Sequence, residues 1–367
     1  MIRHTAYEGC KSFGRSIQQS ISCTITIGFS SFLRSVLGTT LSTLAAFTCG
    51  CIEKEQDIMN IEQDENIEEI EIEFKSEGYY RLTRESVLDI FTFNADSLGH
   101  LDAYQRVQNI NNGKLIISST GGPKKIFIYG NANLNKEDLL NIKTMNDLQK
   151  AFCRLEDIRR EHPFMIGIAD IRTGGMINHI INLKPMISEI ILRSVCCDFS
   201  GTSYEGAHIS DAKVYLTNVN AQCSLADTSI TVQRFINMGM LNTSDIGRFA
   251  EPDIILQTLD RDIRGERIRT DICLICFQNC CKDESMGSPF TRIVLEGKIQ
   301  GETYYWPLSI NRTEQGKGIS DNTRHVFDLT IRRKGCQDPD EEIFIDDSYI
   351  LMDVAQWQEK EENTVMF

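Results

Sequence analysis

The sequence has no segment that would form a membrane-spanning helix. No uncharged, predominantly apolar run reaches the roughly 18 residues that such a helix requires. Basic residues are also few, because 38 Lys and Arg stand against 52 Asp and Glu, which gives a net charge of −14. No basic cluster could displace the counterions of a phosphate backbone, so we expect no nucleic-acid partner.

Sequence motifs of common catalytic chemistry are missing as well. The sequence has no GxSxG, no P-loop and no GxGxxG after a predicted strand. No histidine pair shows the HExxH spacing of a zinc protease, so each histidine is expected in a loop or at the surface. We therefore expect a non-enzymatic protein with no catalytic residue, no metal and no cofactor.

One cysteine cluster could in principle hold zinc, because four thiols have a spacing that resembles two metal-binding knuckles. The cluster reads Cys273-x-x-Cys276-x-x-x-Cys280-Cys281. Cys273 and Cys276 lie inside an apolar run, however, and a three-residue spacing puts them on opposite faces of a strand. No Gly or Pro separates them, so we expect thiols of a core strand rather than metal ligands.

The other cysteines do not suggest a disulfide framework. Four of the thirteen lie within the first 51 residues, and the remaining nine are an odd number. They include the adjacent pairs Cys196-Cys197 and Cys280-Cys281, whose members face opposite sides of a strand. We expect mostly free thiols, with at most one or two bridges.

Residues 35–51 (SVLGTTLSTLAAFTCGC) have the pattern of an export signal. Arg34 precedes an apolar stretch that ends in small residues and cysteines. An ending on cysteine resembles a bacterial lipobox, in which the thiol receives a diacylglyceryl group, so the protein would be anchored to a membrane without spanning it. Cys51, which follows a glycine, is the predicted lipidation site, and Cys49 is the alternative. The other interpretation is a buried amphipathic helix of a cytosolic protein, because short apolar runs are ambiguous.

An acidic segment follows the predicted signal and lipobox region at 1–51. Between residues 52 and 74, ten Asp and Glu residues stand against one Lys. Such a charge run is typical of a solvated, disordered tether. We assign residues 52–68 to this spacer.

After the spacer the pattern becomes that of β-strands. Ile70, Ile72 and Phe74 alternate with glutamates, which predicts a half-buried strand. One helix is expected over residues 136–151, with Asn135 as its N-cap. Further strand-like runs lie at 87–93, 125–129, 189–195, 212–219, 270–277, 292–299, 302–310, 325–333 and 348–357.

The number of short strands favours β-sandwiches over a parallel α/β fold. The length of 367 residues suggests two domains. A turn-rich stretch after a predicted strand puts the boundary near residues 197–205. We therefore expect an N-terminal β-sandwich at 69–199 and a C-terminal one at 200–367.

The C-terminal half resembles the Bacteroidales fimbrillin family, whose members are subunits of type V pili. Residues 288–310 (SPFTRIVLEGKIQGETYYWPLSI) are similar to a family stretch with a strand, a short Gly turn and a Tyr-Tyr-x-Pro strand. Residues 318–343 resemble the segment that leaves a strand through a Gly-x-x-Asp-Pro-Asp turn, and residues 198–221 resemble the start of its second domain. Asp321-Asn322 stands where Arg-Asn is usual, and the cysteine content is high for a pilin. The resemblance implies a mostly β fold of two transthyretin-like β-sandwich domains, with one or two short helices in the N-terminal domain.

The resemblance also implies a route of assembly. Family precursors are exported as outer-membrane lipoproteins, and an Arg-specific protease removes the anchor together with the first strand. Here that strand carries Ile70, Ile72 and Phe74, and the loop at 79–85 (YYRLTRE) offers Arg84 as the cleavage site, with Arg81 as the alternative. A C-terminal strand of the next subunit then replaces the lost one. The donor residues would be Tyr349, Leu351, Val354 and Trp357, followed by the tail to residue 367.

The partners implied are other copies of the chain, related pilin subunits, the Arg-specific protease and, through the lipid, the outer membrane. Two alternatives remain within the family: an anchor subunit that keeps its lipid, and a tip or adhesin subunit without a donated strand. A third alternative is a carbohydrate-binding surface lipoprotein, which would need an aromatic platform. Its candidates, Tyr304, Tyr305 and Trp306, are divided between the two faces of one predicted strand.

Overall fold

The computed structural model describes most of the chain after the acidic spacer. The described residues are 67–78, 80–110, 113–174, 179–226, 235–281, 285, 289–311, 318–341 and 350–356, the last range by its backbone only. Cys49, Cys51, Tyr349 and Trp357 lie outside them. The described residues belong to one compact unit. Within the described part, no helix has the length and apolar character needed to span a membrane.

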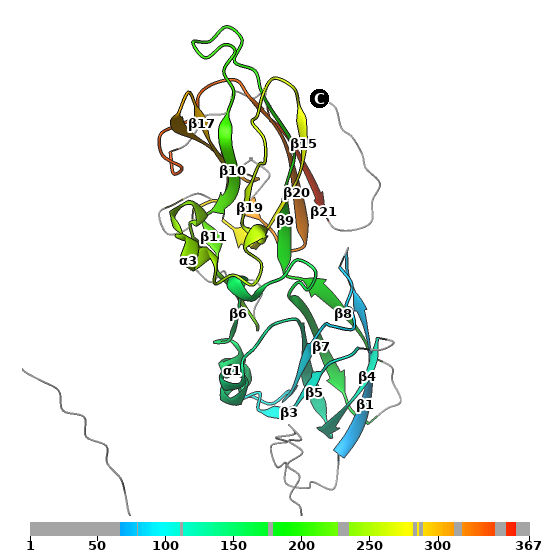
Figure 1. The fold of residues 1–367 in the computed structure, drawn as a ribbon. Helices are drawn as coiled ribbons and strands as arrows, with labels where there is room; N and C mark the ends of the chain where they lie inside the picture. The colour runs from blue at the N-terminus through cyan, green and yellow to red at the C-terminus, as the bar shows by residue number, and fades with distance from the viewer. Residues whose placement is uncertain are drawn as a thin grey trace, which may run out of the picture. The chain divides into compact units, whose positions relative to one another are not determined.

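The N-terminal half of this unit is a β-sandwich whose strands form one folded sheet in the order β3-β2-β5-β7-β8-β1-β4 (Figure 1). Its strands are β1 (Ile67–Ser76), β2 (Leu88–Asn94), β3 (Leu101–Val107), β4 (Lys114–Thr120), β5 (Pro123–Gly130), β7 (Met165–Arg172) and β8 (His179–Pro185). β7 and β8 pair at only two positions, so the sheet divides there into two layers, β3-β2-β5-β7 and β4-β1-β8.

A separate hydrophobic core lies between these two layers. Twelve buried residues form it, and β1 contributes three of them, Ile70, Ile72 and Phe74. The remaining members come from both layers: Leu88, Ile90, Ile117, Ile126, Ile128, Met165, Ile171, Ile181 and Leu183. The alternation predicted for β1 is present, because the intervening Glu69 and Glu71 are exposed.

Two short helices replace the single helix expected over residues 136–151. They are α1 (Lys136–Asn141) and α2 (Met145–Leu148). Asn135 caps α1 as predicted, since its side chain accepts a hydrogen bond from the Asp138 amide. The helix ends at Ile142, whose backbone is extended, and Thr144 then starts α2 with a capping box. The expected helix was too long because Thr144 is a strong N-cap in the middle of the apolar pattern.

The C-terminal half consists of two four-stranded sheets, in the orders β14-β10-β17-β18 and β15-β9-β20-β21. Their strands are β9 (Ile187–Cys197), β10 (Ser210–Thr217), β14 (Leu256–Thr258), β15 (Ile268–Phe277), β17 (Arg292–Ile299), β18 (Glu302–Ser309), β20 (Thr323–Ile331) and β21 (Ile350–Gln356). Apolar side chains of both sheets belong to one core cluster, which identifies the arrangement as a second β-sandwich. The predicted hairpin joins β17 and β18, and Gln300 and Gly301 both have positive φ there, as a primed two-residue turn requires.

Small elements complete the described fold. They are β6 (Phe152–Arg154), β11 (Val219–Asn220), β12 (Gln222–Ser224), β13 (Phe235–Ile236), β16 (Asn279–Cys280), β19 (Gly318–Ile319), α3 (Thr243–Ile246) and the 3-10 turns η1 (Leu155–Asp157), η2 (Met238–Met240) and η3 (Pro252–Ile254). They pair as β6-β12, β11-β13 and β16-β19.

The chain passes from the first sandwich to the second at Met186, between β8 and β9. The expected boundary lay later, between residues 199 and 200. β9 pairs with β15 and β20, so it lies with the C-terminal strands, and the turn-rich stretch after it connects β9 to β10 inside the second sandwich. Only Met186 separates β8 from β9, and Pro185 is the one turn-type residue beside it, so the sequence pattern gave little indication of this point. Whether the two sandwiches are independent domains stays a prediction.

Candidate functional site: the first strand and the loop after it

β1 is an inner strand of its layer. It pairs antiparallel with β4 from Ile67 to Glu73, and parallel with β8 from Ile72 to Ser76. β4 has no other strand partner among the described residues, because it ends the sheet. Removing β1 would therefore leave an unpaired edge on β8 and an isolated β4.

The inward side of β1 carries three buried apolar side chains. Ile70, Ile72 and Phe74 are 5%, 0% and 7% exposed. Burial of an aliphatic or aromatic side chain contributes about 1.5–3 kcal/mol, so the three together contribute roughly 5–9 kcal/mol. Loss of β1 would open an apolar groove between β4 and β8, and the contribution of these three side chains would be lost with it.

A buried polar cluster holds the end of β4 against the other layer. The Asp102 carboxylate of β3 accepts hydrogen bonds from the Ser119 hydroxyl at 2.7 Å and from the Thr120 amide and hydroxyl at 2.9 and 2.6 Å. Lys124 of β5, whose side chain is fully buried, lies 3.1 Å from the same carboxylate and donates to Asn94 at 2.5 Å. Burial raises the pKa of Asp102, but the hydrogen bonds from Thr120 and Ser119 outweigh it and hold the pKa below its usual value.

The loop after β1 presents its arginines to solvent. Arg84 is exposed in a tight turn that the Ser86 amide closes on the Thr83 carbonyl at 3.1 Å. Arg81 is exposed as well, and its guanidinium donates to the carbonyls of Gly78 and Tyr80 within the loop. An exposed turn with arginines is accessible to a trypsin-like protease, because proteolysis concentrates at such sites.

Tyr80 connects this loop to the second sandwich through a side-chain hydrogen bond. Its hydroxyl donates to the Glu189 carboxylate of β9 at 2.9 Å, and Arg324 of β20 donates to the same carboxylate at 2.8 Å. Burial, reinforced by the Glu189 charge, raises the pKa of Tyr80, so the hydroxyl remains a hydrogen-bond donor at neutral pH. The loop is thus fixed on either side of its exposed arginines, by Tyr80 before them and by Val87, whose amide donates to Asn131, after them.

The expected donor segment lies at the edge of the second sandwich. β21, which contains Leu351 and Val354, pairs antiparallel with β20 over its full length. It ends its sheet, so one backbone edge of β21 has no strand partner among the described residues. The structure thus places the predicted first strand and the predicted donor strand in different sheets.

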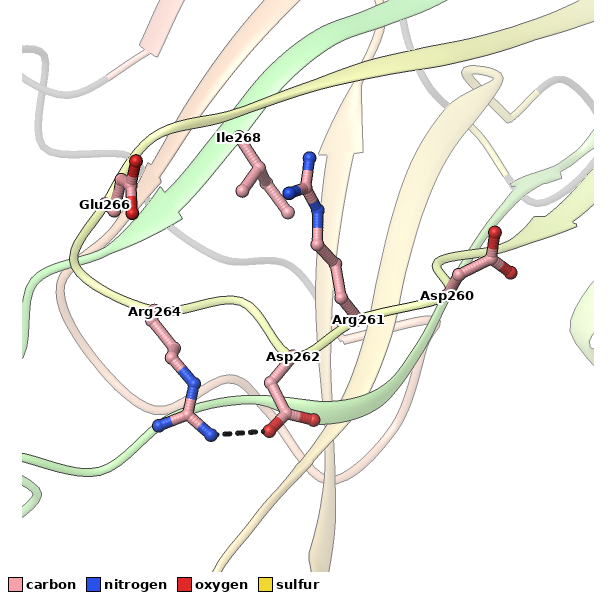
Figure 2. Close-up of a pocket in the computed structure, with 6 residues that line it drawn as sticks. All are labelled: Asp260, Arg261, Asp262, Arg264, Glu266 and Ile268. Atoms are coloured by element: carbon pink, nitrogen blue, oxygen red, sulfur yellow. Dashed lines mark hydrogen bonds and ion pairs between the residues drawn. The ribbon is translucent and has the colours of Figure 1, made fainter.

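Figure 2 shows a surface pocket in the loop between β14 and β15, with a volume of about 460 Å³. Five of its six lining residues are charged: Asp260, Arg261, Asp262, Arg264 and Glu266, beside Ile268. The Asp262 carboxylate accepts from Arg264 at 2.8 Å and lies 3.4 Å from His208, and all three side chains are partly exposed. Three carboxylates stand against two guanidinium groups in this lining, and Asp262 and Arg264 already pair with each other in contact with water.

The cysteine cluster and the aromatic candidates are part of the fold. Cys276 is buried and Cys273 half-buried, and burial raises the pKa of each thiol to about 12. The described residues contain no group of three or more potential ligands placed to hold a metal ion. Tyr304 and Trp306 are also buried, so they cannot form part of an exposed aromatic platform.

Comparison with known proteins identifies the fold. No family model and no curated protein matches the sequence. Solved structures do match, and two of them are each described as a "putative cell adhesion protein". The one from Bacteroides eggerthii DSM 20697 has a TM-score of 0.61 at 15% identity, over 80% of this chain and 96% of that chain. The one from Parabacteroides distasonis ATCC 8503 has a TM-score of 0.55 at 13% identity, over 80% and 98%.

A fimbrilin from Porphyromonas gingivalis W83 matches with a TM-score of 0.56 at 12% identity, over 80% of this chain and 98% of that chain. The chain has a fimbrillin-like fold. This confirms the β-sandwich fold class and the resemblance on which it rested. At these identities the match concerns the fold alone.

Within this fimbrillin-like fold, the sequence pattern located β1, its buried residues and the arginine loop. It missed the cluster of Asp102, Lys124 and Thr120, and the anchoring role of Tyr80. The one signal in the sequence was the pair Lys124-Lys125 at the start of the apolar run of β5. A lysine that is buried with such a strand needs a partner for its charge. The partner lies on another strand, so sequence spacing could not reveal it.

Proposed function

We propose that this protein is a structural, non-enzymatic subunit of a surface pilus. It is exported as an outer-membrane lipoprotein precursor and polymerises when proteolysis removes β1 and a strand of another subunit replaces it. The observation that carries the proposal is the position of β1: an inner strand with three core side chains, followed directly by an exposed turn at Arg84. The fimbrillin-like fold supports the same proposal.

The precursor stays monomeric because β1 fills its own groove. A tethered strand has an effective concentration that a separate molecule cannot match. A cut after Arg84, or after Arg81, converts β1 from a tethered strand into a separate peptide that can dissociate. The roughly 5–9 kcal/mol of apolar burial then becomes available to an incoming strand, together with the backbone partners on β4 and β8.

The incoming strand comes from the C-terminus of another copy. β21 is apolar in sequence (ILMDVAQ) and lies at a sheet edge, so it can leave β20 without breaking the interior of a sheet. A contact between one subunit's groove and another subunit's end is heterologous, and contacts of this kind propagate as fibres. The partners are therefore copies of this chain and related pilin subunits.

The proposal is tested with the full-length precursor and a trypsin-like protease under native conditions. We expect cleavage in the loop at 80–85 before any cut in the sandwiches, followed by fibres seen by electron microscopy. Arg81→Ala combined with Arg84→Ala should abolish both cleavage and growth. Arg172→Ala, at an exposed position of β7, is the matched control and should change neither. Normal polymerisation of the double variant would show that the cut lies elsewhere.

A second variant separates cleavage from growth. Deletion of residues 349–367 should leave cleavage intact and prevent fibre growth, because the donor is lost. Growth of fibres by this deletion variant would rule out the C-terminus as the donor.

The lipid anchor is tested separately in cells. A fatty-acid analogue should label the precursor, and Cys51→Ala should abolish the label. Labelling that persists in this variant and is lost in Cys49→Ala would move the anchor by two residues. Labelling that persists in both variants would contradict the lipoprotein precursor.

A further inference from the structure

One small sheet is built from strands of both sandwiches. β6 follows α2 in the N-terminal half, and β12 follows β11 in the C-terminal half, yet the two pair antiparallel. Nearby contacts also cross this junction: the Tyr129 hydroxyl donates to the Leu225 carbonyl at 2.7 Å, and the Ala250 amide donates to the Glu156 carbonyl at 2.7 Å.

Two cysteines face each other in this sheet. Cys153 of β6 is directly opposite Cys223 of β12, and their exposed fractions are 0% and 5%. Directly opposite residues of an antiparallel pair have side chains on the same face. The other described cysteines in paired strands face different residue types, for example Cys276 opposite Ser188 and Cys196 opposite Thr330. The pairing of two cysteines is therefore specific to this junction.

The spacing of the pair is close to that of a disulfide. The amides of Leu155 and Leu225 donate to carbonyls of the other strand, which makes the Cys153–Cys223 position a hydrogen-bonded pair. Opposite Cα atoms at such a position are about 5.5 Å apart, within the range that disulfides span. The Cβ atoms are about 4.5–5.5 Å apart, so the strands need to approach by roughly 1 Å. Each strand is three residues long, which makes this shift easy to accommodate.

We propose that Cys153 and Cys223 form a disulfide that covalently joins the two sandwiches. The structure shows both as free thiols and so describes the reduced state. Oxidation converts two S–H groups into one S–S bond, and the two electrons and two protons pass to a disulfide of another protein or of a small molecule, which is reduced to two thiols. The oxidising compartments that exported proteins enter supply a disulfide of this kind.

The bond forms while the junction folds. Once the chain has folded, burial raises the pKa of both thiols, that of Cys223 to about 12, so little thiolate is left to attack an oxidant. On this proposal, exchange takes place while β6 and β12 assemble and water still reaches both thiols.

The disulfide adds a second covalent route between the sandwiches. In the reduced chain the covalent connection runs through Met186 alone, whereas the bridge closes the loop between residues 153 and 223. A closed loop stabilises mainly by restricting the unfolded chain. The geometry of this inference rests on strand register and burial and not on pilus assembly, whereas its oxidant in the cell rests on the proposed export.

The test uses the full chain, refolded from denaturant in a buffer of reduced and oxidised glutathione. Free thiols are then alkylated under denaturing conditions, and the chain is digested with trypsin. We expect one cross-linked pair of peptides, residues 151–154 with residues 214–234, whose mass is lower by two hydrogens than the sum of its parts. Cys276→Ser is the matched control and should leave this pair unchanged. Alkylation of both Cys153 and Cys223, or a bridge from either one to a different cysteine, would overturn the proposal.

A stability measurement gives the second readout. The oxidised chain should unfold about 5–15 °C above the chain treated with a reductant. Cys153→Ala combined with Cys223→Ala should remove this difference, whereas Cys276→Ser should retain it. Equal unfolding temperatures of oxidised and reduced wild-type protein would contradict a bridge that joins the sandwiches.

Discussion

The contribution of β1 can be measured with a single substitution. Ile72→Ala removes most of a side chain that is 0% exposed and belongs to the core between the two layers. The matched control is Ile116→Ala on β4, where the same residue type is 56% exposed and lies opposite Glu71 on the outer face. Both changes remove the same atoms, so their difference reports burial.

The expected magnitude follows from the environment of Ile72. A buried Ile→Ala change costs about 2–5 kcal/mol, because a cavity remains in addition to the lost burial. At about 1.4 kcal/mol for each factor of ten, the equilibrium for release of β1 rises roughly 30- to 4,000-fold. Ile116→Ala should stay within about 0.5 kcal/mol of wild type, as is typical of exposed positions.

Native-state hydrogen exchange of the uncut precursor measures this release directly. The amides of β1 that pair with β4 and β8 should lose protection in Ile72→Ala, while the amides of the second sandwich should keep it. Equal protection of β1 in Ile72→Ala and Ile116→Ala would refute the reasoning, because the inward side of β1 would then not hold the strand in place.

Three further substitutions test other parts of the structure in thermal or denaturant unfolding. Asp102→Ala leaves the Lys124 cation buried without its carboxylate, which should lower the free energy of unfolding by about 3–5 kcal/mol. Burial lowers the pKa of His325 to about 4, so the unfolded chain binds a proton that the folded chain excludes. The stability should therefore be full above about pH 6.5 and fall by roughly 3 kcal/mol toward pH 4. His325→Gln should remove this loss, and His208→Gln, at a partly exposed histidine, should retain it. Gly301→Ala meets no atom within 4 Å but has φ of +90°, so it should cost about 1–2 kcal/mol from the backbone alone.

The sequence predicted those parts of the fold that depend on local pattern. The period of two in Ile70, Ile72 and Phe74 predicted β1 because every second side chain of a strand faces the core. The Gln300-Gly301 hairpin was also predictable, since few turns connect strands in so short a distance. Asn135 was recognised as a helix cap because its side chain acts on an amide three residues ahead.

The features that the sequence concealed depend on contacts between distant strands. From the sequence alone, Lys124 would be expected at the surface. In the structure it is buried, because Asp102 of β3 and Thr120 of β4 lie beside it. The passage between the sandwiches at Met186 has Pro185 as its one turn-type residue, because β8 continues almost directly into β9. Cys153 and Cys223 are 70 positions apart, and only their strand register reveals that they are neighbours.

The mixed pairing of β1 gives its site a direction. One neighbour, β4, runs against β1 and the other, β8, runs along with it. The hydrogen-bond patterns of the two ladders differ, so a replacement strand satisfies both only when its own N-to-C direction is that of β1. Every junction in a filament built this way would have the same orientation. The filament would therefore be polar, with one end that presents empty sites and another that presents free strands.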